Sequence, residues 1–280
     1  MRELLVGLMK LLPNKLFYFI IFIYKLKYIP NFKNPKSLNE KLNFIKLNKT
    51  NYDLRCLVVD RIKVRDYVLQ KTSECTLINN LWVGVNFEND IWKSLPNKFV
   101  IKANHGSGMV RVIDKNKDTF EETQSLCEIW LKKDYASRGR EWFYLNLEKI
   151  IIVEEFIEFN NDVPPDYKFF CMNGRVEMIQ VDLDRFKGHV RNLYDRDFNR
   201  IQGSLYYPQG YDIEAPIMLE KAIKISECLA QDFDFIRVDL YLLEDKIYFG
   251  ELTNIPGNGI ETFKPKSLDF KLGDKLELSN

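Results

Sequence analysis

Residues 237–259 read Arg-Val-Asp-Leu-Tyr-Leu-Leu-Glu-Asp-Lys-Ile-Tyr-Phe-Gly-Glu-Leu-Thr-Asn-Ile-Pro-Gly-Asn-Gly, two β-rich runs with a polar break between them. The runs 238–243 and 246–252 predict a hairpin. Pairing of the two strands can bring Asp239 and Glu251 side by side. Two adjacent carboxylates repel unless a cation lies between them, and hard oxygen ligands favour Mg²⁺. The stretch therefore predicts either a metal site or a solvated hairpin with scattered acids.

A second informative stretch is residues 98–112, Lys-Phe-Val-Ile-Lys-Ala-Asn-His-Gly-Ser-Gly-Met-Val-Arg-Val, which reads strand, glycine loop, strand. The loop Gly106-Ser107-Gly108 could wrap phosphates with its backbone amides while Lys102 supplies a positive charge. It is neither a Walker loop nor a Gly-x-Ser-x-Gly nucleophile elbow. A simple turn at the tip of a hairpin is the alternative interpretation.

Three further strands are expected between these two stretches. Residues 150–157, Ile-Ile-Ile-Val-Glu-Glu-Phe-Ile, predict a strand with an acidic pair near its end. Residues 166–174, Asp-Tyr-Lys-Phe-Phe-Cys-Met-Asn-Gly, and residues 175–181, Arg-Val-Glu-Met-Ile-Gln-Val, predict two strands joined by an Asn-Gly turn. Asn-Gly between such runs is a strong hairpin signal.

In this order the motifs resemble the ATP-grasp fold. More narrowly, they are similar to the TupA-like branch, named for teichuronopeptide biosynthesis and found in bacterial surface-polysaccharide clusters. The resemblance covers roughly residues 31–275, and it implies an α+β fold in which two mostly antiparallel sheets with flanking helices clasp the nucleotide. The further segments that fit this branch are 34–41, 98–108, 139–142 and 167–170.

The resemblance also implies a division of the chain into consecutive parts. They are a basic, apolar N-terminal segment (1–30), a helical N-terminal part of the ATP-grasp unit (31–97), a small lid (98–157) and a large ATP- and metal-binding part (158–275).

Helices are expected at four places. A capping box, Ser37 with Glu40, predicts a helix over 38–47. Apolar spacing predicts others over 52–69, 119–132 and 213–231. The positions expected to face inward are Phe120, Leu126, Ile129 and Trp130 in the third helix and Met218, Ala222, Ile225 and Leu229 in the fourth.

Composition limits the function classes. The chain has 280 residues and a net charge of +1, without the broad basic footprint of a nucleic-acid binder, so no nucleic-acid partner is expected. Its five cysteines are widely spaced and never form Cys-x-x-Cys, which indicates reduced core residues and no zinc site. These features favour a cytoplasmic location.

The N-terminal segment departs from this average. Residues 1–36 hold seven Lys or Arg against one acid, and residues 16–24 are all apolar or aromatic. Nine such residues fall far short of the ~20 needed to span a bilayer, and no secretory signal is evident. Residues 1–30 therefore predict either a peripheral contact with anionic lipid at the inner face of the membrane, or a helix packed on the domain.

The resemblance assigns residues to ATP. Lys102 corresponds to the lysine that reaches the nucleotide phosphates, and Gly106, Ser107 and Gly108 correspond to the loop that folds over them. The remaining nucleotide-binding residues implied are Glu154, Glu155 and Ile157 at the hinge, Asp166 at the ribose, and Arg61 where a phosphate-contacting lysine is common.

The same resemblance makes Asp239 and Glu251 the ligands of Mg²⁺. Many relatives carry Asn two residues after the Glu, whereas this chain has Thr253 followed by Asn254. Either side chain could complete the site. Arg237, on the same strand face as Asp239, suits the stabilisation of developing oxyanions.

The implied reaction is ATP-dependent ligation of a carboxylate to an amine through an acyl phosphate, with release of ADP. The expected substrates are a small-molecule or glycan-linked carboxylate, such as a sugar acid, and an amine. The cationic stretch 184–191, with His189 and Arg191, would line the acceptor side together with Gly257 and Gly259. His189 could equally be a solvated loop residue. The catalytic residues implied are Lys102, Arg237, His189 and Arg191.

Two other functions stay open. A glycosyltransferase would use an Asp-x-Asp motif, which residues 182–184 and 195–197 spell. A non-catalytic ATP-grasp module would bind nucleotide or a partner without ligation, and the departures at Arg61 and Thr253 would fit it.

Overall fold

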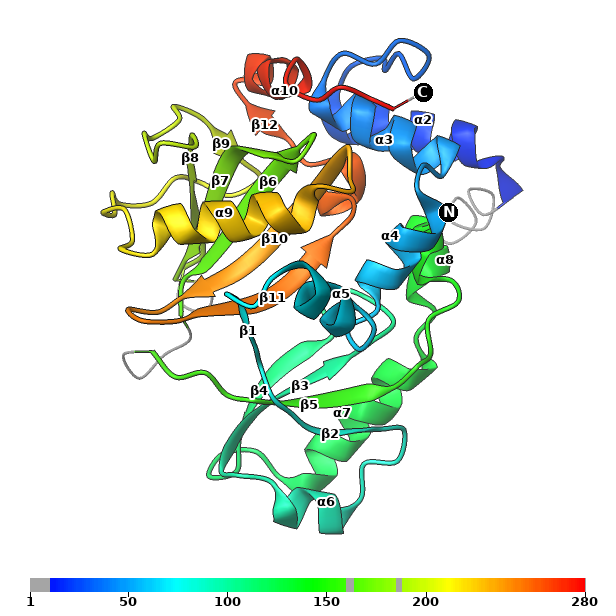
Figure 1. Cartoon of the computed structure of the whole chain (residues 1–280). Coiled ribbons are helices and arrows are strands. Elements are labelled where there is room, and N and C mark those ends of the chain that lie inside the picture. Colours follow the sequence, from blue (N-terminus) through cyan, green and yellow to red (C-terminus); the bar gives the residue numbers. More distant parts are fainter. Residues whose placement is uncertain (1–10, 160–163, 185–187, 280) are drawn as a thin grey trace. The chain divides into compact units, whose positions relative to one another are not determined.

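The computed structural model describes residues 11–159, 164–184 and 188–279 (Figure 1). The chain divides into two compact units. The first unit is made of Met1–Asn51, Asp166–Asp239 and Thr253–Asn280, and the second of Tyr52–Pro165 and Leu240–Leu252. Both units are discontinuous in sequence, unlike the consecutive parts expected from the sequence.

The first unit is built on an antiparallel sheet. Its strands follow the order β10-β6-β7-β8, and the Asn173–Gly174 turn that joins β6 to β7 has φ angles of 50° and 78°. These positive angles are those that an Asn-Gly hairpin turn requires, so the expected hairpin is confirmed. The strands are β6 (Asp166–Met172), β7 (Arg175–Leu183), β8 (Val190–Tyr194) and β10 (Phe235–Leu242), with the short antiparallel pair β9 (Ser204–Leu205) and β12 (Phe263–Lys264).

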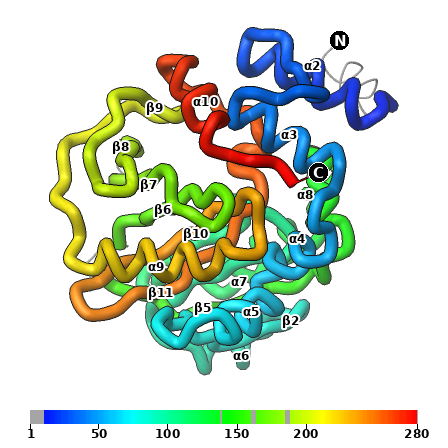
Figure 2. The backbone as a smooth tube through the Cα atoms, turned by 45° about the horizontal axis from the view of Figure 1, so that its top comes forward, coloured from blue at the N-terminus to red at the C-terminus, as the bar shows by residue number. Residues whose placement is uncertain are grey.

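Helices cover this sheet and extend the unit. Helix α9 lies across β6 and β7 and buries Ala222, Ile225 and Leu229, as its periodicity predicted (Figure 2). It begins at Leu219 rather than at residue 213, so Met218, which was expected to face inward, lies before the helix and is half-buried. The other helical elements of the unit are α2 (Asn14–Leu26), α3 (Leu38–Asn48), α9 (Leu219–Ala230), the 3-10 turn η2 (Pro256–Gly259) and α10 (Lys266–Gly273).

Helix α3 joins distant parts of the sequence. The predicted capping box is confirmed, since Ser37 accepts from the Glu40 N–H and Glu40 accepts from the Ser37 N–H. Asn39 donates to both carboxylate oxygens of Asp269 in α10, from its main-chain and side-chain nitrogens, each at 3.0 Å. Lys41 donates to the carbonyl oxygen of Gly273 at 2.8 Å. These bonds fasten α3 to α10.

The second unit contains a four-stranded antiparallel sheet in the order β2-β5-β3-β4. Phe99, Ile101 and Val153 of this sheet form its core together with Cys127 and Trp130 of helix α7. The strands are β2 (Asn80–Gly84), β3 (Lys98–Ala103), β4 (Val110–Asp114) and β5 (Ile151–Glu155), with β1 (Thr76–Leu77) parallel to β11 (Ile247–Thr253).

Helices of the second unit depart from expectation in two places. The prediction of a single helix over 52–69 is wrong, because the structure has two helices there. Between them the Asp60 carboxylate accepts from the N–H groups of Ile62 and Lys63, which interrupts the helical hydrogen bonding. Helix α7 begins at Phe120, directly after Thr119, which forms a capping box with Glu122, but Ile129 is exposed rather than inward. The helical elements are α4 (Tyr52–Val59), α5 (Val64–Lys71), α6 (Asn89–Ser94), α7 (Phe120–Lys132), α8 (Tyr135–Gly139) and η1 (Trp142–Tyr144).

Among the described residues, none of the helices combines the length and the apolar character that crossing a bilayer requires.

Candidate functional site

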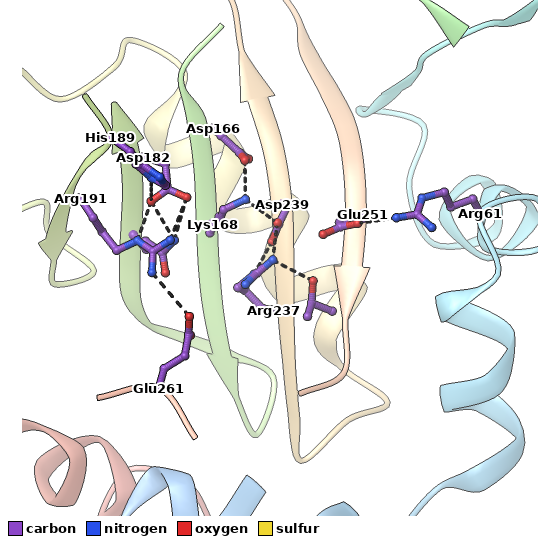
Figure 3. A network of polar contacts seen from close by, with 12 residues as sticks. Arg61, Asp166, Lys168, Asp182, His189, Arg191, Arg237, Asp239, Glu251 and Glu261 are labelled. Carbon is purple, nitrogen blue, oxygen red and sulfur yellow. Dashed lines mark hydrogen bonds and ion pairs between the residues drawn. The ribbon is translucent and has the colours of Figure 1, made fainter. Parts of the chain in front are cut away.

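Arg237 and Asp239 form a bidentate ion pair in the first unit. The two residues are two apart on β10, so their side chains share a face, as strand alternation predicted. Arg237 donates from Nε and Nη2 to the two Asp239 carboxylate oxygens, each at 2.6 Å, and from Nη2 to the Thr253 hydroxyl at 2.9 Å (Figure 3). Asp239 is only 3% exposed. Arg237 therefore balances the charge of a shielded carboxylate and fixes its orientation.

Lys168 on β6 extends this pair into a row of four charges. Its ammonium donates to Asp239 Oδ2 at 2.8 Å and also to the Asp166 carboxylate (Figure 3). Burial lowers the pKa of Lys168, but the carboxylates of Asp166 and Asp239 outweigh it and raise that pKa above its usual value. Lys168 is therefore a cation at neutral pH. Asp166 was predicted as a site residue and Lys168 was not, although the two residues face the same side of one strand.

Asp182 and Arg191 form a second ion pair of the same unit. They are register partners on β7 and β8, and Arg191 donates from Nε to Asp182 Oδ1 at 2.6 Å and from Nη2 to Oδ2 at 3.2 Å. Burial raises the pKa of Asp182, yet the hydrogen bonds and charge of Arg191 lower it to about 2. Arg191 Nη1 donates to the Leu205 carbonyl at 3.2 Å and lies 3.7 Å from Glu261. The contacts of Arg191 thus fix neighbouring protein groups.

His189 lies beside this pair. Its ring stacks on Tyr207 with centroids 3.8 Å apart, and its Nε2 is 3.3 Å from Asp182 Oδ1 (Figure 3). The Arg191 guanidinium also lies over the Tyr207 ring, 4.8 Å from its centroid. The predicted residues His189 and Arg191 therefore lie together around one acid, Asp182, and one aromatic ring, Tyr207, neither of which was predicted as part of this site.

In the second unit, Arg61 braces the glycine loop. Its Nη1 donates to the carbonyl oxygens of Ala103, Asn104 and Gly106 at 3.0, 3.2 and 3.2 Å. Its Nη2 donates to Glu251 at 3.4 Å (Figure 3). Arg61 therefore connects the loop to a predicted metal ligand, and its expected contact with phosphate stays a prediction.

The glycines of the loop have distinct structural roles. A Cβ at Gly106 would lie 2.4 Å from the Tyr135 ring, so only glycine fits there without movement. Gly108 has φ +72°, the left-handed region that glycine adopts readily, and faces open space. Ser107 and Gly108 form the exposed tip. The loop is thus packed at one end and open at its tip.

Lys102 and Glu154 form an ion pair on neighbouring strands β3 and β5, and both side chains are largely buried. The predicted phosphate-binding lysine therefore contacts a predicted hinge residue. Next to them, the Glu155 N–H donates to the Asn79 carbonyl and the Glu155 carboxylate accepts from the Asn79 amide, each at 3.0 Å. Pairing of the Glu155 and Ile157 backbone with adenine stays a prediction.

The predicted metal ligands belong to both units: Asp239, Thr253 and Asn254 to the first, Glu251 to the second. Their joint coordination of one ion stays a prediction. Within the described ranges, no cluster of three or more His, Cys, Asp or Glu forms a ready cation site. The donor chemistry nevertheless fits Mg²⁺ bound with a nucleotide, which takes one or two carboxylates and phosphate oxygens. Asp239 Oδ1 accepts from Arg237, and Oδ2 accepts from both Arg237 and Lys168.

The two Asp-x-Asp motifs considered for a nucleotide-sugar site have structural contacts. Asp182 pairs with Arg191 and accepts from Gln180 at 3.1 Å. Asp195 Oδ1 accepts from the N–H groups of Asp197 and Asn199 at 3.0 and 2.8 Å, which is the bonding of a turn. The first acid of each motif therefore stabilises its own strand or turn.

Comparison with known proteins identifies one family. The family model described as TupA-like ATP-grasp matches residues 40–277. No curated protein matches the sequence of this chain.

Solved structures with a related fold share little sequence with it. D-Alanine–D-alanine ligase from Bacillus anthracis, complexed with ATP, is 13% identical over 72% of this chain, with a TM-score of 0.42. The same enzyme from Helicobacter pylori is 15% identical over 80%, with a TM-score of 0.44. ATP-grasp ligase PsnB, complexed with minimal precursor, is 7% identical over 80%, with a TM-score of 0.45. The chain spans 55%, 60% and 61% of the length of these three proteins.

Proposed function

We infer the function of this chain from its family. The chain belongs to the TupA-like ATP-grasp family. We propose that it is an ATP-dependent ligase that joins a carboxylate to an amine and releases ADP. Such a reaction needs cations beside the transferring phosphoryl group and no covalent nucleophile on the protein. The predicted α+β class agrees with the mixed helices and mostly antiparallel sheets of the chain.

The observation that best supports this proposal is the buried row Arg237–Asp239–Lys168–Asp166. Removing four charged groups from water carries a desolvation cost that their attraction does not reliably offset, and well-packed apolar residues would often stabilise a fold equally well. The pKa of the buried Lys168 is shifted by burial and by its two carboxylate partners, and ionisable groups with shifted pKa values cluster at functional sites. A row of alternating charges on the face of a sheet would hold each group in a fixed orientation for phosphate and acyl-phosphate oxygens.

The proposed reaction has two steps. The carboxylate substrate attacks the γ-phosphorus of ATP, the bond from that phosphorus to ADP breaks, and an acyl phosphate forms. The amine then attacks the acyl carbon, inorganic phosphate leaves, and the nitrogen loses a proton to give the amide. Lys102 would balance phosphate charge under the loop Gly106–Gly108, and Arg237 would stabilise the oxyanion of the tetrahedral adduct.

Asp239 and Glu251 would hold Mg²⁺, with Thr253 or Asn254 completing its coordination. When bound, the ion would neutralise charge on the phosphate oxygens. Asp166 would accept from the ribose hydroxyls. Because Lys168 contacts both Asp166 and Asp239, it would keep the ribose and metal ends of the nucleotide site in register.

We propose a sugar acid or related carboxylate of a bacterial surface polysaccharide as the acid substrate, and an amino acid or small amine as the second. His189 and Arg191 would line the acceptor side. Gly257 and Gly259 would line the same side. Because Arg191 is bonded to Asp182, we propose that Arg191 fixes the orientation of these acceptor-side groups. The reaction would take place in the cytoplasm, at the inner face of the membrane.

The deciding experiment measures nucleotide products over a panel of acids and amines. We expect ADP and phosphate that depend on both substrates and on Mg²⁺. We also expect ATP with Mg²⁺ to raise the melting temperature, because a ligand at a hundredfold excess over Kd stabilises the folded state by ~2.7 kcal/mol.

Matched variants make this experiment specific. Asp239→Asn should lower turnover roughly 100-fold or more, because it removes a charge that holds the ion. Asp245→Asn, in the exposed turn of the same hairpin, should turn over like the wild type. Release of a nucleoside diphosphate from a sugar donor, or wild-type turnover of Asp239→Asn, would contradict the proposal.

A further inference from the structure

Helix α2 is attached to the first unit through one face only. Tyr18 and Phe22 are 3% and 0% exposed and form a small core with Phe32. The Lys46 ammonium of α3 lies over the Tyr18 ring, 4.0 Å from its centroid. The packed helix predicted as one alternative is therefore present, and its packed face is occupied by the first unit.

The opposite face of α2 is apolar and exposed. Leu16, Ile20 and Tyr24 are 44%, 37% and 66% exposed. Residues four apart fall on one side of a helix, so these three form a continuous stripe along its length. Single exposed apolar residues are ordinary on a protein surface, but an ordered stripe of them indicates a contact surface.

The charges around this stripe have one sign. Helix α2 reads Asn-Lys-Leu-Phe-Tyr-Phe-Ile-Ile-Phe-Ile-Tyr-Lys-Leu and contains no Asp or Glu. Lys15, Lys25 and Lys27 are exposed at its two ends. The Lys27 ammonium lies 4.8 Å from the centroid of the exposed Tyr24 ring. A tyrosine with a neighbouring lysine suits the boundary between acyl chains and headgroups, where one end is apolar and the other wet.

We propose that the exposed stripe Leu16, Ile20 and Tyr24 of α2 binds the surface of an anionic phospholipid bilayer. Lys27 beside Tyr24, and Lys15 and Lys25, which are exposed near the two ends of the helix, would add attraction to the lipid phosphates. The helix would lie in the plane of the interface, with its apolar stripe among the acyl chains and its lysines at the lipid phosphates. Its 13 residues extend about 20 Å, too short to cross the bilayer. This inference is independent of the proposed ligase reaction.

Charge complementarity decides between lipid and a second copy of the chain. Two copies meeting through this face would bring their lysines together, and like charges oppose association. An anionic bilayer instead attracts each lysine with ~1 kcal/mol. The lipid surface is therefore the occupant that matches both the apolar and the charged groups of this face.

The test is sedimentation of the full chain with vesicles. We expect binding to vesicles of phosphatidylcholine mixed with phosphatidylglycerol, weakened by added salt, and no binding to phosphatidylcholine alone. The combined variant Leu16→Ser, Ile20→Ser and Tyr24→Ser should abolish binding. Its matched control, Leu81→Ser, Val83→Ser and Ile129→Ser, replaces exposed apolar residues of the second unit and should bind like the wild type.

A second pair of variants tests the charges. Lys15→Gln, Lys25→Gln and Lys27→Gln together should weaken binding roughly 100-fold, from ~1 kcal/mol for each cation. Lys93→Gln, Lys117→Gln and Lys132→Gln change the net charge equally at exposed positions elsewhere and should have little effect. Unchanged melting temperatures would show that all variants fold.

Three outcomes would overturn the proposal. They are failure of the full chain to bind the anionic vesicles, wild-type binding by the apolar variant, and a concentration-dependent dimer that the apolar variant loses. The last would assign the face to a second copy. These measurements do not depend on the turnover of soluble substrates. If the vesicle experiments contradict membrane binding, the ligase proposal can therefore still be tested separately.

Discussion

At the scale of single residues, the candidate site depends on cations that bridge acids. Lys168 contacts Asp166 on its own strand and Asp239, which is 71 positions away in sequence. The common face of Arg237 and Asp239 could be predicted because strand alternation is local. The contact between Lys168 and Asp239 could not, because it depends on which strands become neighbours.

Replacement of Lys168 by methionine should lower the free energy of unfolding by about 3–5 kcal/mol, because two buried carboxylates lose a shared cation. Urea unfolding measures this change. Lys275→Met removes a lysine that is mostly exposed and serves as the control, with an expected change within about 0.5 kcal/mol. A Lys168→Met protein as stable as this control would show that the ion pairs contribute nothing to the fold.

The pKa of Asp182 gives stability a defined pH dependence. This pKa is lowered from 3.8 to about 2 in the folded chain, against the cost of burial, chiefly by Arg191. The unfolded state therefore binds the proton first as pH falls. The stabilisation is complete above pH ~4 and is lost as pH decreases toward 2, a change of ~2 kcal/mol.

Comparison of the wild type with Asp182→Asn isolates this contribution. Between pH 5 and pH 2 the unfolding free energy of the wild type should decrease by ~2 kcal/mol more than that of the variant. The variant should also be less stable at pH 7, because Arg191 would keep its buried charge without a carboxylate partner. Parallel pH profiles for the two proteins would rule out the assigned role of Arg191.

At the scale of elements, the sequence predicted boundaries that depend on neighbouring residues. The capping box of α3 begins that helix where expected, because its side-chain and backbone partners are three residues apart. The division between α4 and α5 could not be predicted this way. Asp60 there also accepts from the Asn104 amide at 3.2 Å, a contact 44 positions away.

Gly106→Ala should distort the loop without unfolding the second unit. The new methyl group would lie 2.4 Å from the Tyr135 ring, so the loop or the ring must move. We expect weaker ATP binding, measured by calorimetry, with the largest part of the loss recovered when Tyr135→Ala makes room. Gly108→Ala is the comparison, because its new methyl group would meet open space. The only obstacle to alanine there is the left-handed φ of +72°. Equal effects of the two alanine variants would exclude contact with Tyr135 as the cause.

At the scale of the whole molecule, the order of motifs predicted the family, and the family match over 40–277 confirms it. The α+β class is also confirmed. The way the chain is shared between its units was beyond prediction, because each unit is made from separated segments. The pairing of Asp182 with Arg191 and the stacking of Tyr207 on His189 were beyond prediction for the same reason, since the partners come from other strands and loops.

The bonds between α3 and α10 have a consequence for how the chain emerges from the ribosome. Asn39 and Asp269 are 230 positions apart, so α3 leaves the exit tunnel long before its partner is translated. At about 5–20 residues per second, the delay is roughly 10–45 s. During that interval α3 lacks its contacts with η2 and α10, both of which are translated near the end of the chain. The packing of α3 is therefore completed only when translation is nearly finished.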